Sequence, residues 1–182
     1  MTGRLVLVVG PSGAGKDTLI AAAREALRDE SRFVFPRRTI TRDAVAELED
    51  HDTTDEAEFA RLQEAGAFAL TWQAHGLSYG LPAAIAADIA AGRIVVCNGS
   101  RAMADIAGRT FPGTRVVLID AEPKVRAARL AGRGRESTAE IAARLAREVA
   151  QVPAGAVRID NSGRREDGSA AFIAALRQIA ED

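Results

Sequence analysis

The sequence predicts an α/β domain in which a parallel sheet of about five strands is flanked by helices. Short apolar runs alternate along the chain with segments of helical periodicity, the pattern of parallel strands joined by helices. Hydrophobic residues make up 47% of the chain and aromatic residues only 4%, which favours helices packed closely on a sheet. No internal repeat or linker divides the 182 residues, so 1–182 is expected to form a single domain.

The strands are expected where the apolar runs lie. These runs are residues 4–9, 67–72, 94–98, 114–120 and 157–160, with a further extended piece near 33–35. Pro82 is typical of a first helical position, and Gly92 of the residue just past the end of that helix. The last helix is expected from about 169 to 179.

Capping boxes predict the starts of two other helices. Asp55 is followed three residues later by Glu58, and Ser137 by Glu140. Two segments do not fit the alternating pattern. Residues 41–54 are acidic and weakly periodic, so a loop or small flap is expected there. Residues 132–136 carry two arginines between two helices and are expected to form a lid of the kind that closes over a substrate.

A glycine-rich loop follows the first strand and leads into a helix, the context that a phosphate-binding loop requires. Its residues are Gly10, Pro11, Ser12, Gly13, Ala14, Gly15, Lys16, Asp17 and Thr18. The glycines allow backbone N–H groups to turn toward a phosphate, and the helix adds the positive end of its dipole. The sequence therefore predicts a nucleotide-binding protein in which Lys16 contacts the β- and γ-phosphate oxygens.

Asp17 occupies the position where this motif normally has the serine or threonine that binds Mg²⁺, and Thr18 comes one residue later. A carboxylate is a good hard ligand for Mg²⁺, directly or through water. The competing interpretation is an acidic residue that only favours the helix dipole.

Charge and cysteine content exclude several classes of function. The formal net charge is −1, so neither nucleic acid nor a membrane surface is expected as a partner. Basic residues nevertheless gather at 37–42 and 126–147, which suggests small anionic ligands. Cys97 is the only cysteine, which excludes a disulfide and a cysteine-based metal site. No signal peptide or membrane-spanning run is found, so the expected location is the cytoplasm; a homodimer stays open.

Five motifs, taken together, resemble the guanylate-kinase-like family over nearly the whole chain. They are Gly10-Pro-Ser-Gly-Ala-Gly-Lys16, Thr39-Ile-Thr-Arg42, Gly76-Leu-Ser-Tyr79-Gly80, Arg129-Leu-Ala-Gly-Arg133-Gly and Asp160-Asn161. The resemblance implies a P-loop, nucleoside-monophosphate-kinase-like fold. It also implies a substrate-binding flap at about 33–80 and a lid at about 129–147.

Four variants are shared with one branch of that family, the ribose 1,5-bisphosphate phosphokinases of phosphonate breakdown. They are Gly-Lys-Asp at 15–17, Ile-Thr-Arg-Asp-Ala at 40–44, Asn-Gly-Ser-Arg-Ala at 98–102 and Arg-Gly-Arg-Glu at 133–136. The resemblance implies transfer of the γ-phosphoryl group of ATP, with Mg²⁺, to the 1-phosphate of ribose 1,5-bisphosphate. The products would be 5-phospho-α-D-ribose 1-diphosphate and ADP.

Departures from true guanylate kinases support this branch. The second arginine of the family's phosphate-binding segment falls on Val45, the serine that helps read guanine falls on Arg38, and the guanine-reading glutamate falls on Leu70. A base whose polar edge is left unpaired can be rejected by roughly 10⁴-fold. A smaller, base-free acceptor is therefore expected. A phosphate monoester carries about −1.5 to −2 charge near neutral pH and needs no general base.

The resemblance assigns roles to further residues. Asn98 stands where related kinases have an acidic residue, and we hypothesise that Asp17 supplies the charge missing there. Asn161 is expected near the adenine ring. Lid arginines would stabilise the transferring phosphoryl group, with Arg129 as support: Arg133, Arg135 and Arg144. The acceptor would be held by Arg38, Arg42, Glu49, His51, Tyr79, Asn98 and Arg101. Each of these has a structural alternative, such as a surface ion pair, a core tyrosine, a helix cap or a solvated loop.

Three other functions stay open from sequence. The first is a guanylate or other nucleoside monophosphate kinase. The second is a non-catalytic guanylate-kinase-like binding module. The third is a gluconate-type sugar kinase, which would need a carboxylate base, and Asp43 is the only nearby candidate.

Overall fold

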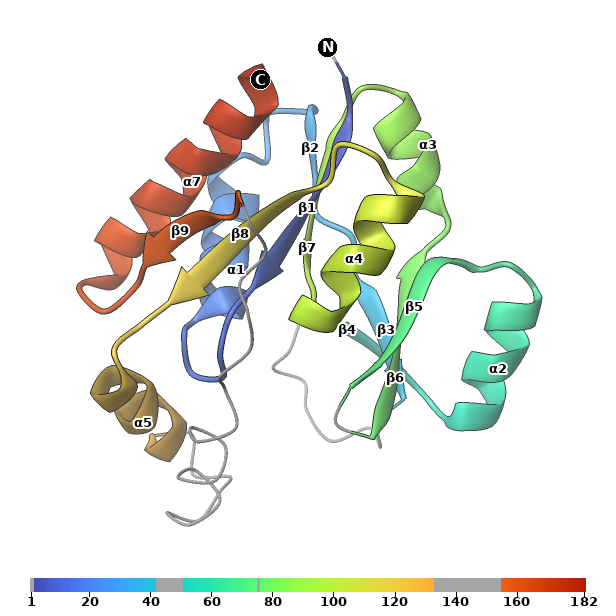
Figure 1. Ribbon diagram of the computed structural model, residues 1–182, viewed down its shortest axis with the longest axis horizontal. Helices are drawn as coiled ribbons and strands as arrows, with labels where there is room; N and C mark the ends of the chain where they lie inside the picture. Colours follow the sequence, from blue (N-terminus) through green and yellow to red (C-terminus); the bar gives the residue numbers. More distant parts are fainter. Residues whose placement is uncertain (1, 42–50, 75, 133–154) are drawn as a thin grey trace.

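The structure is a computed structural model, and it describes residues 2–41, 51–74, 76–132 and 155–182. In these segments the chain forms a five-stranded sheet of order β2-β7-β1-β8-β9 and a four-stranded sheet of order β4-β3-β6-β5 (Figure 1). The larger sheet contains β1 (Arg4–Val9), β2 (Phe33–Val34), β7 (Ile94–Asn98), β8 (Arg115–Asp120) and β9 (Val157–Asp160). All of its pairings are parallel. This confirms the predicted fold class.

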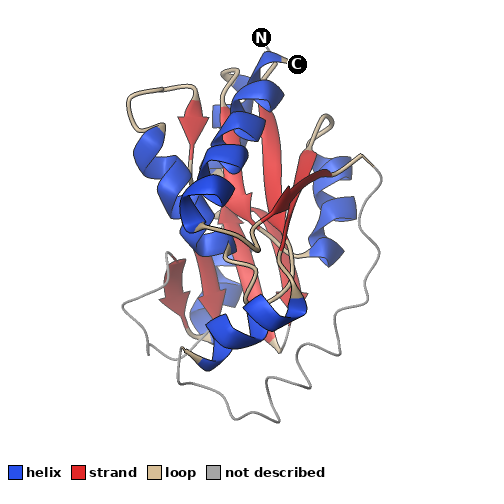
Figure 2. Cartoon of the chain, turned by 90° about the vertical axis from the view of Figure 1, so that its left-hand side faces the viewer, coloured by secondary structure: helices blue, strands red, loops and turns tan. Residues whose placement is uncertain are grey.

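The central strand β1 is buried along its whole length because both faces of the sheet are covered. Val6 and Val8 pack into one apolar cluster with α1 (Lys16–Ala26) and α7 (Arg165–Glu181). Leu5, Leu7 and Val9 face a second cluster, to which α3 (Ala84–Ala90) and α4 (Arg101–Thr110) contribute. Figure 2 shows α7, the helix that ends at the C-terminus, lying across the strands on the side that faces the viewer.

The smaller sheet lies beyond the carboxyl ends of the parallel strands, next to α2 (Glu56–Glu64) (Figure 1). It contains β3 (Arg38–Thr41), β4 (His51–Thr54), β5 (Phe68–Ala74) and β6 (Leu77–Pro82). β3 pairs parallel with β4, whereas β6 pairs antiparallel with both β3 and β5.

Two strand predictions were wrong. The run at 67–72, expected in the parallel sheet, belongs to β5 of the smaller sheet. In this strand Leu70 and Trp72 are buried while their neighbours are more exposed, and such one-sided burial is typical of antiparallel pairing. The segment 41–54, expected as a loop, ends in the strand β4, which pairs with β3.

Pro82 does not begin a helix; it is the last residue of β6, and the N-cap of α3 is Ala83. The hydrogen bonding of the smaller sheet continues one residue past Pro82, because the N–H of Ala83 donates to the carbonyl of Ala67 at 2.8 Å. Gly92 behaves as predicted, with φ at 83° just past the end of α3.

The Asp55–Glu58 capping box is confirmed, since the backbone N–H of Glu58 donates to Asp55 Oδ1 at 2.7 Å. The predicted box at Ser137 lies outside the described residues. The last helix begins at Arg165, four residues before the expected start, and includes Gly168 in its first turns. Among the segments described, no helix has the length and apolar character needed to cross a membrane.

Candidate active site

The phosphate loop (residues 10–18) connects β1 to α1 at the carboxyl end of the parallel sheet, and its glycines are required by close packing. Gly13 and Gly15 have φ values of 80° and 94°, a region that favours glycine. A Cβ atom at Gly10 would lie 2.0 Å from the carbonyl oxygen of Ile119, and one at Gly13 would lie 2.8 Å from that of Arg126. The loop is therefore held between β8 and α5 (Pro123–Ala131).

Lys16 begins α1, and its ammonium group lies over the phosphate loop. The Nζ atom donates to the carbonyl oxygen of Gly10 at 2.7 Å and to that of Pro11 at 3.1 Å. An ammonium group has three N–H donors, so phosphate oxygens bound in the loop would compete with these carbonyls for the same group. Contact of Lys16 with phosphate stays a prediction, and the structure places the ammonium group at the loop where that contact is expected.

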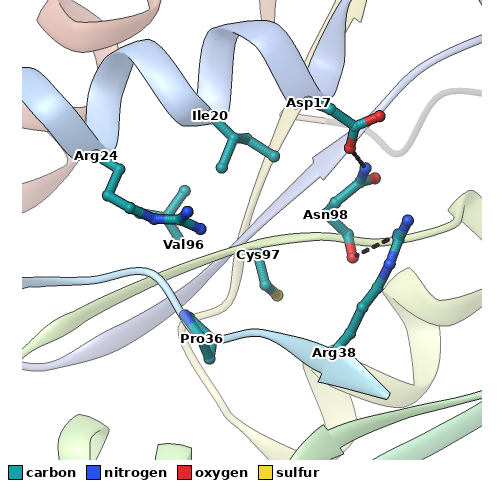
Figure 3. A pocket seen from close by; sticks show the side chains of 8 residues that line it. All are labelled: Asp17, Ile20, Arg24, Pro36, Arg38, Val96, Cys97 and Asn98. Atoms are coloured by element: carbon teal, nitrogen blue, oxygen red, sulfur yellow. Dashed lines mark hydrogen bonds between the residues drawn. The ribbon is translucent and has the colours of Figure 1, made fainter. Parts of the chain in front are cut away.

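Asp17 and Asn98 meet at the same edge of the sheet. Asp17 lies in the first turn of α1, Asn98 ends β7, and β7 pairs directly with β1. The side-chain amide of Asn98 donates to Asp17 Oδ1 at 2.5 Å (Figure 3). The amide orients the exposed carboxylate next to Lys16, where the donor phosphates would lie.

These two side chains fit the Mg²⁺ that the sequence predicts. Magnesium keeps several waters and is held by one or two carboxylates together with substrate phosphates, so one carboxylate at the phosphate loop is sufficient. Within the described segments no three histidine, cysteine or acidic side chains gather to form a metal site of their own. Asp17, directly or through water, is the group that would hold the ion there.

Arg38 lies across from Asp17 at the end of an aromatic stack. Its guanidinium lies 5.6 Å from the centroid of the Tyr79 ring, which stacks on Trp72 at 5.1 Å with an interplanar angle of 11°. Its NH1 group also points to the backbone oxygen of Asn98 at 3.5 Å (Figure 3). The aromatic contact supports the charged group beside the phosphate loop. Arg38, Tyr79 and Asn98, which the sequence assigned to one substrate site, are thus brought together.

Leu70 is 5% exposed and packs in the second apolar cluster with Leu81 and Ile85. The resemblance aligns this position with the guanine-reading glutamate of true guanylate kinases. Here the side chain is part of the core and offers no hydrogen-bonding group to a base.

Asn161 is buried behind the phosphate loop, with 4% of its surface exposed. Its Nδ2 donates to the carbonyl oxygen of Ala14 at 2.7 Å, and Arg129 donates to the same oxygen at 3.3 Å and to the backbone oxygen of Asn161 at 2.8 Å. Cβ atoms at Gly15 and Gly168 would lie 2.5 Å and 2.2 Å from the amide of Asn161. Sequence reasoning missed this brace, because the last helix was expected to begin at about 169 and Gly168 was not recognised as part of it.

Other predicted site residues are placed as follows. His51 is the first residue of β4, 6% exposed, so it is buried where a solvated loop was the alternative. Arg101 is the first residue of α4. The remaining predicted residues lie outside the described segments: Arg42, Glu49, Arg133, Arg135 and Arg144.

A pocket opens beside Asp17 and Asn98, between α1, β7 and the segment that leads from β2 into β3 (Figure 3). Its lining residues are Asp17, Ile20, Arg24, Pro36, Arg38, Val96, Cys97 and Asn98. Burial raises the pKa of the Cys97 thiol to about 12, an effect that the nearby charge of Arg38 only partly opposes. The thiol is therefore neutral at physiological pH and serves as an apolar wall. Arg24 was not predicted, although it lies seven residues after Asp17 on the same helix face.

Comparison with known proteins identifies the family. The chain is 52% identical over 180 residues to the ribose 1,5-bisphosphate phosphokinase of Brucella melitensis, covering 98% of this chain and 94% of that protein. It is 54% identical over 175 residues to the corresponding protein of Acidiphilium cryptum, covering 96% and 93%. The chain belongs to the ribose 1,5-bisphosphate phosphokinase family. No protein-family model matches it.

Solved structures agree with the fold. The guanylate kinase of Anaplasma phagocytophilum superimposes with a TM-score of 0.68 at 17% identity, over 100% of this chain and 88% of that one. At this identity the likeness concerns the fold alone. It confirms the guanylate-kinase-like architecture predicted from the motifs.

Proposed function

We propose that the protein transfers the γ-phosphoryl group of ATP to the 1-phosphate of ribose 1,5-bisphosphate in phosphonate breakdown. An oxygen of the 1-phosphate forms a bond to the γ-phosphorus, and the bond from the γ-phosphorus to the oxygen bridging to the β-phosphate breaks. The products are 5-phospho-α-D-ribose 1-diphosphate and ADP. The relatives that share about half of the sequence over nearly its full length carry this name.

One structural observation carries the choice of acceptor. The position of the guanine-reading glutamate is filled by Leu70 in the core, while Arg38 presents a guanidinium beside the phosphate loop. A site that offers positive charge and no base-reading group suits a phosphorylated sugar better than a nucleotide.

The chemistry demands positioning and charge neutralisation more than proton transfer. A phosphate monoester is already an anionic nucleophile, so no general base is assigned. Lys16 would neutralise the β- and γ-phosphates, and Asp17 would hold Mg²⁺, which would supply further positive charge at the donor phosphates. Arg38 would orient the acceptor phosphate for in-line attack, since correct placement alone lowers such barriers substantially. The arginines at 133, 135 and 144 are proposed to close over the transferring group.

An assay of ADP release with Mg²⁺ and ATP tests this function. Ribose 1,5-bisphosphate, GMP and ribose 5-phosphate are compared as acceptors, and phosphorus NMR identifies the product. We expect a diphosphate only from ribose 1,5-bisphosphate. The guanylate-kinase fold makes GMP the critical comparison. Turnover of GMP in its place would refute the proposal, and no turnover with any acceptor would favour a binding module.

A further inference from the structure

We propose that the pocket beside the phosphate loop holds the sugar bisphosphate lengthwise, with Arg24 binding the phosphate that does not react. This inference rests on the proposed function and adds a subsite to it. The reacting phosphate would lie between Asp17 and Arg38, and the second phosphate would lie at the other end of the pocket, against the guanidinium of Arg24 (Figure 3).

The orientation follows from the two ends of the pocket. Asp17 is next in sequence to Lys16, whose ammonium group lies over the phosphate loop, so the phosphoryl donor arrives at this end. The acceptor phosphate must therefore lie here, within reach of Arg38 and of a metal held at Asp17. A substrate with two phosphates then needs a second positive group at a distance from the first.

Arg24 supplies that group because of the geometry of α1. Asp17, Ile20 and Arg24 are spaced by three and four residues, so they lie on one face of the helix. Seven residues at 1.5 Å each separate the first and last Cα atoms by about 10 Å along the axis. Side chains of a helix lean toward its N-terminus, which brings the guanidinium back over the pocket toward Val96, as Figure 3 shows.

The surroundings of Arg24 differ from those of a solvated surface arginine. The side chain is half-buried, and its guanidinium carbon lies 5.9 Å from the centroid of the Phe35 ring. Arg28, one turn later, is 64% exposed and pairs with Glu25 at 2.5 Å. A cation partly removed from water binds a phosphate more strongly than an exposed one, because solvent screens it less.

The side chains between the two ends carry no group that would read the polar edge of a base. They are Ile20, Val96, Cys97 and Pro36, and the neutral thiol of Cys97 is at most a weak donor. A pocket lined by two guanidinium groups and one carboxylate attracts a bisphosphate, since each phosphate monoester carries about −1.5 to −2 charge. The apolar middle leaves the charged ends to determine which ligand binds.

Isothermal titration calorimetry tests the subsite directly. The whole protein, with Mg²⁺ and a non-hydrolysable ATP analogue, is titrated with ribose 1,5-bisphosphate and with ribose 1-phosphate, which lacks the second phosphate. Wild-type protein is expected to bind the bisphosphate more tightly by roughly 10- to 100-fold, the usual effect of a charge-assisted hydrogen bond. Arg24→Met should reduce this ratio to about threefold or less while leaving the affinity for ribose 1-phosphate unchanged.

Three further variants make the result specific. Arg24→Gln removes the charge with a different side chain, and Arg24→Lys should restore part of the preference because it keeps the charge but not the planar donor fork. Arg28→Gln is the matched control and should bind both sugars as the wild type does. Thermal unfolding establishes that each variant is folded.

Several results would overturn the subsite. The wild type could bind both sugars with equal affinity, or fail to bind the bisphosphate. Arg24→Met and Arg24→Gln could both keep the preference for the bisphosphate. These two variants could also lose affinity for both sugars by the same factor. The last would assign Arg24 a purely structural role on Phe35. Failure of the proposed function is distinguished by the product. Wild-type protein that binds the bisphosphate but forms no diphosphate would refute the reaction. The subsite would still be tested by the ratio of the affinities for ribose 1,5-bisphosphate and ribose 1-phosphate.

Discussion

Gly168→Ala tests whether the buried Asn161 braces the phosphate loop. Gly168 lies in the first turns of α7, where an alanine would ordinarily stabilise the helix by about 0.5–1 kcal/mol. In this structure the new Cβ would lie 2.2 Å from Asn161 Oδ1 and 3.1 Å from Cγ, against an ordinary contact of 3.4 Å or more. Asn161 cannot move to the other side, because Gly15 already approaches its amide closely there.

The cost can be worked from these contacts. Overpacking a close-packed site costs about 1–3 kcal/mol. A displaced amide would also lose the 2.7 Å hydrogen bond from the buried Asn161 Nδ2 to the carbonyl of Ala14, at a further cost of about 1–3 kcal/mol. After subtraction of the helix gain, the free energy of unfolding should fall by about 3 kcal/mol. For a chain of this size that lowers the Tm by about 6–12 °C.

Thermal unfolding by circular dichroism measures the change, and the KM for ATP reports on the loop. Gly108→Ala is the control. Gly108 is helical like Gly168, but it is exposed, and a Cβ added to it would have nothing within 4 Å. The Tm of the Gly108→Ala protein should rise slightly. We expect Gly168→Ala to raise the KM for ATP as well as to lower the Tm. A Gly168→Ala protein as stable as the wild type would refute the reasoning. Asn161→Ala combined with Gly168→Ala should be less destabilised than the sum of the single changes, since one clash is removed.

Three other predictions concern the site. Lys16→Met should lower kcat by roughly 10²–10³-fold with little change in Tm, measured by ADP release and thermal unfolding; a loss explained by unfolding would count against its role. Asp17→Ser should lower turnover and raise the Mg²⁺ concentration required, and adding Asn98→Asp should recover activity if the two positions exchange one charge; unchanged metal dependence in the single variant would end that hypothesis. Burial raises the pKa of Cys97 to about 12 from an ordinary 9.0, so the folded protein keeps a proton that the unfolded chain releases above about pH 9. The free energy of unfolding should therefore fall as the pH rises from about 9 toward 12, and Cys97→Ala should flatten that part of the profile in denaturant titrations.

Local features were predictable because short-range physics determines them. The apolar run at 4–9, the glycines of the phosphate loop and the capping box at Asp55 can each be recognised within a few residues of sequence. The start of α3 could not be found in this way. Pro82 suits a helix start as well as a strand end, and the hydrogen bond from Ala83 to Ala67 decided between them.

Assignment of strands to sheets needed the tertiary structure. The sequence predicted a strand at 67–72 from its short apolar run, and in β5 Leu70 and Trp72 of that run are more buried than their neighbours. The partner strand β6 was not expected. Its residues include Ser78 and Gly80, which weaken any strand pattern, and it is stabilised by pairing on both sides with β3 and β5.

The sequence by itself determined the phosphate loop, because an apolar run, glycines and a lysine lie together within the first 16 residues. It also determined the parallel sheet and the family, because apolar runs alternate with helical segments and five motifs of the family occur along the chain. Only the tertiary structure decided which distant side chains meet. Asn98 reaches Asp17 across 81 positions, and Asn161 reaches Ala14 across 147. These contacts follow from the order β2-β7-β1-β8-β9, which places three carboxyl-terminal strand ends around one loop. Periodicity along a chain predicts strands but carries no information on their order, so the brace at Asn161 and the position of Arg24 emerge only when the sheet is assembled.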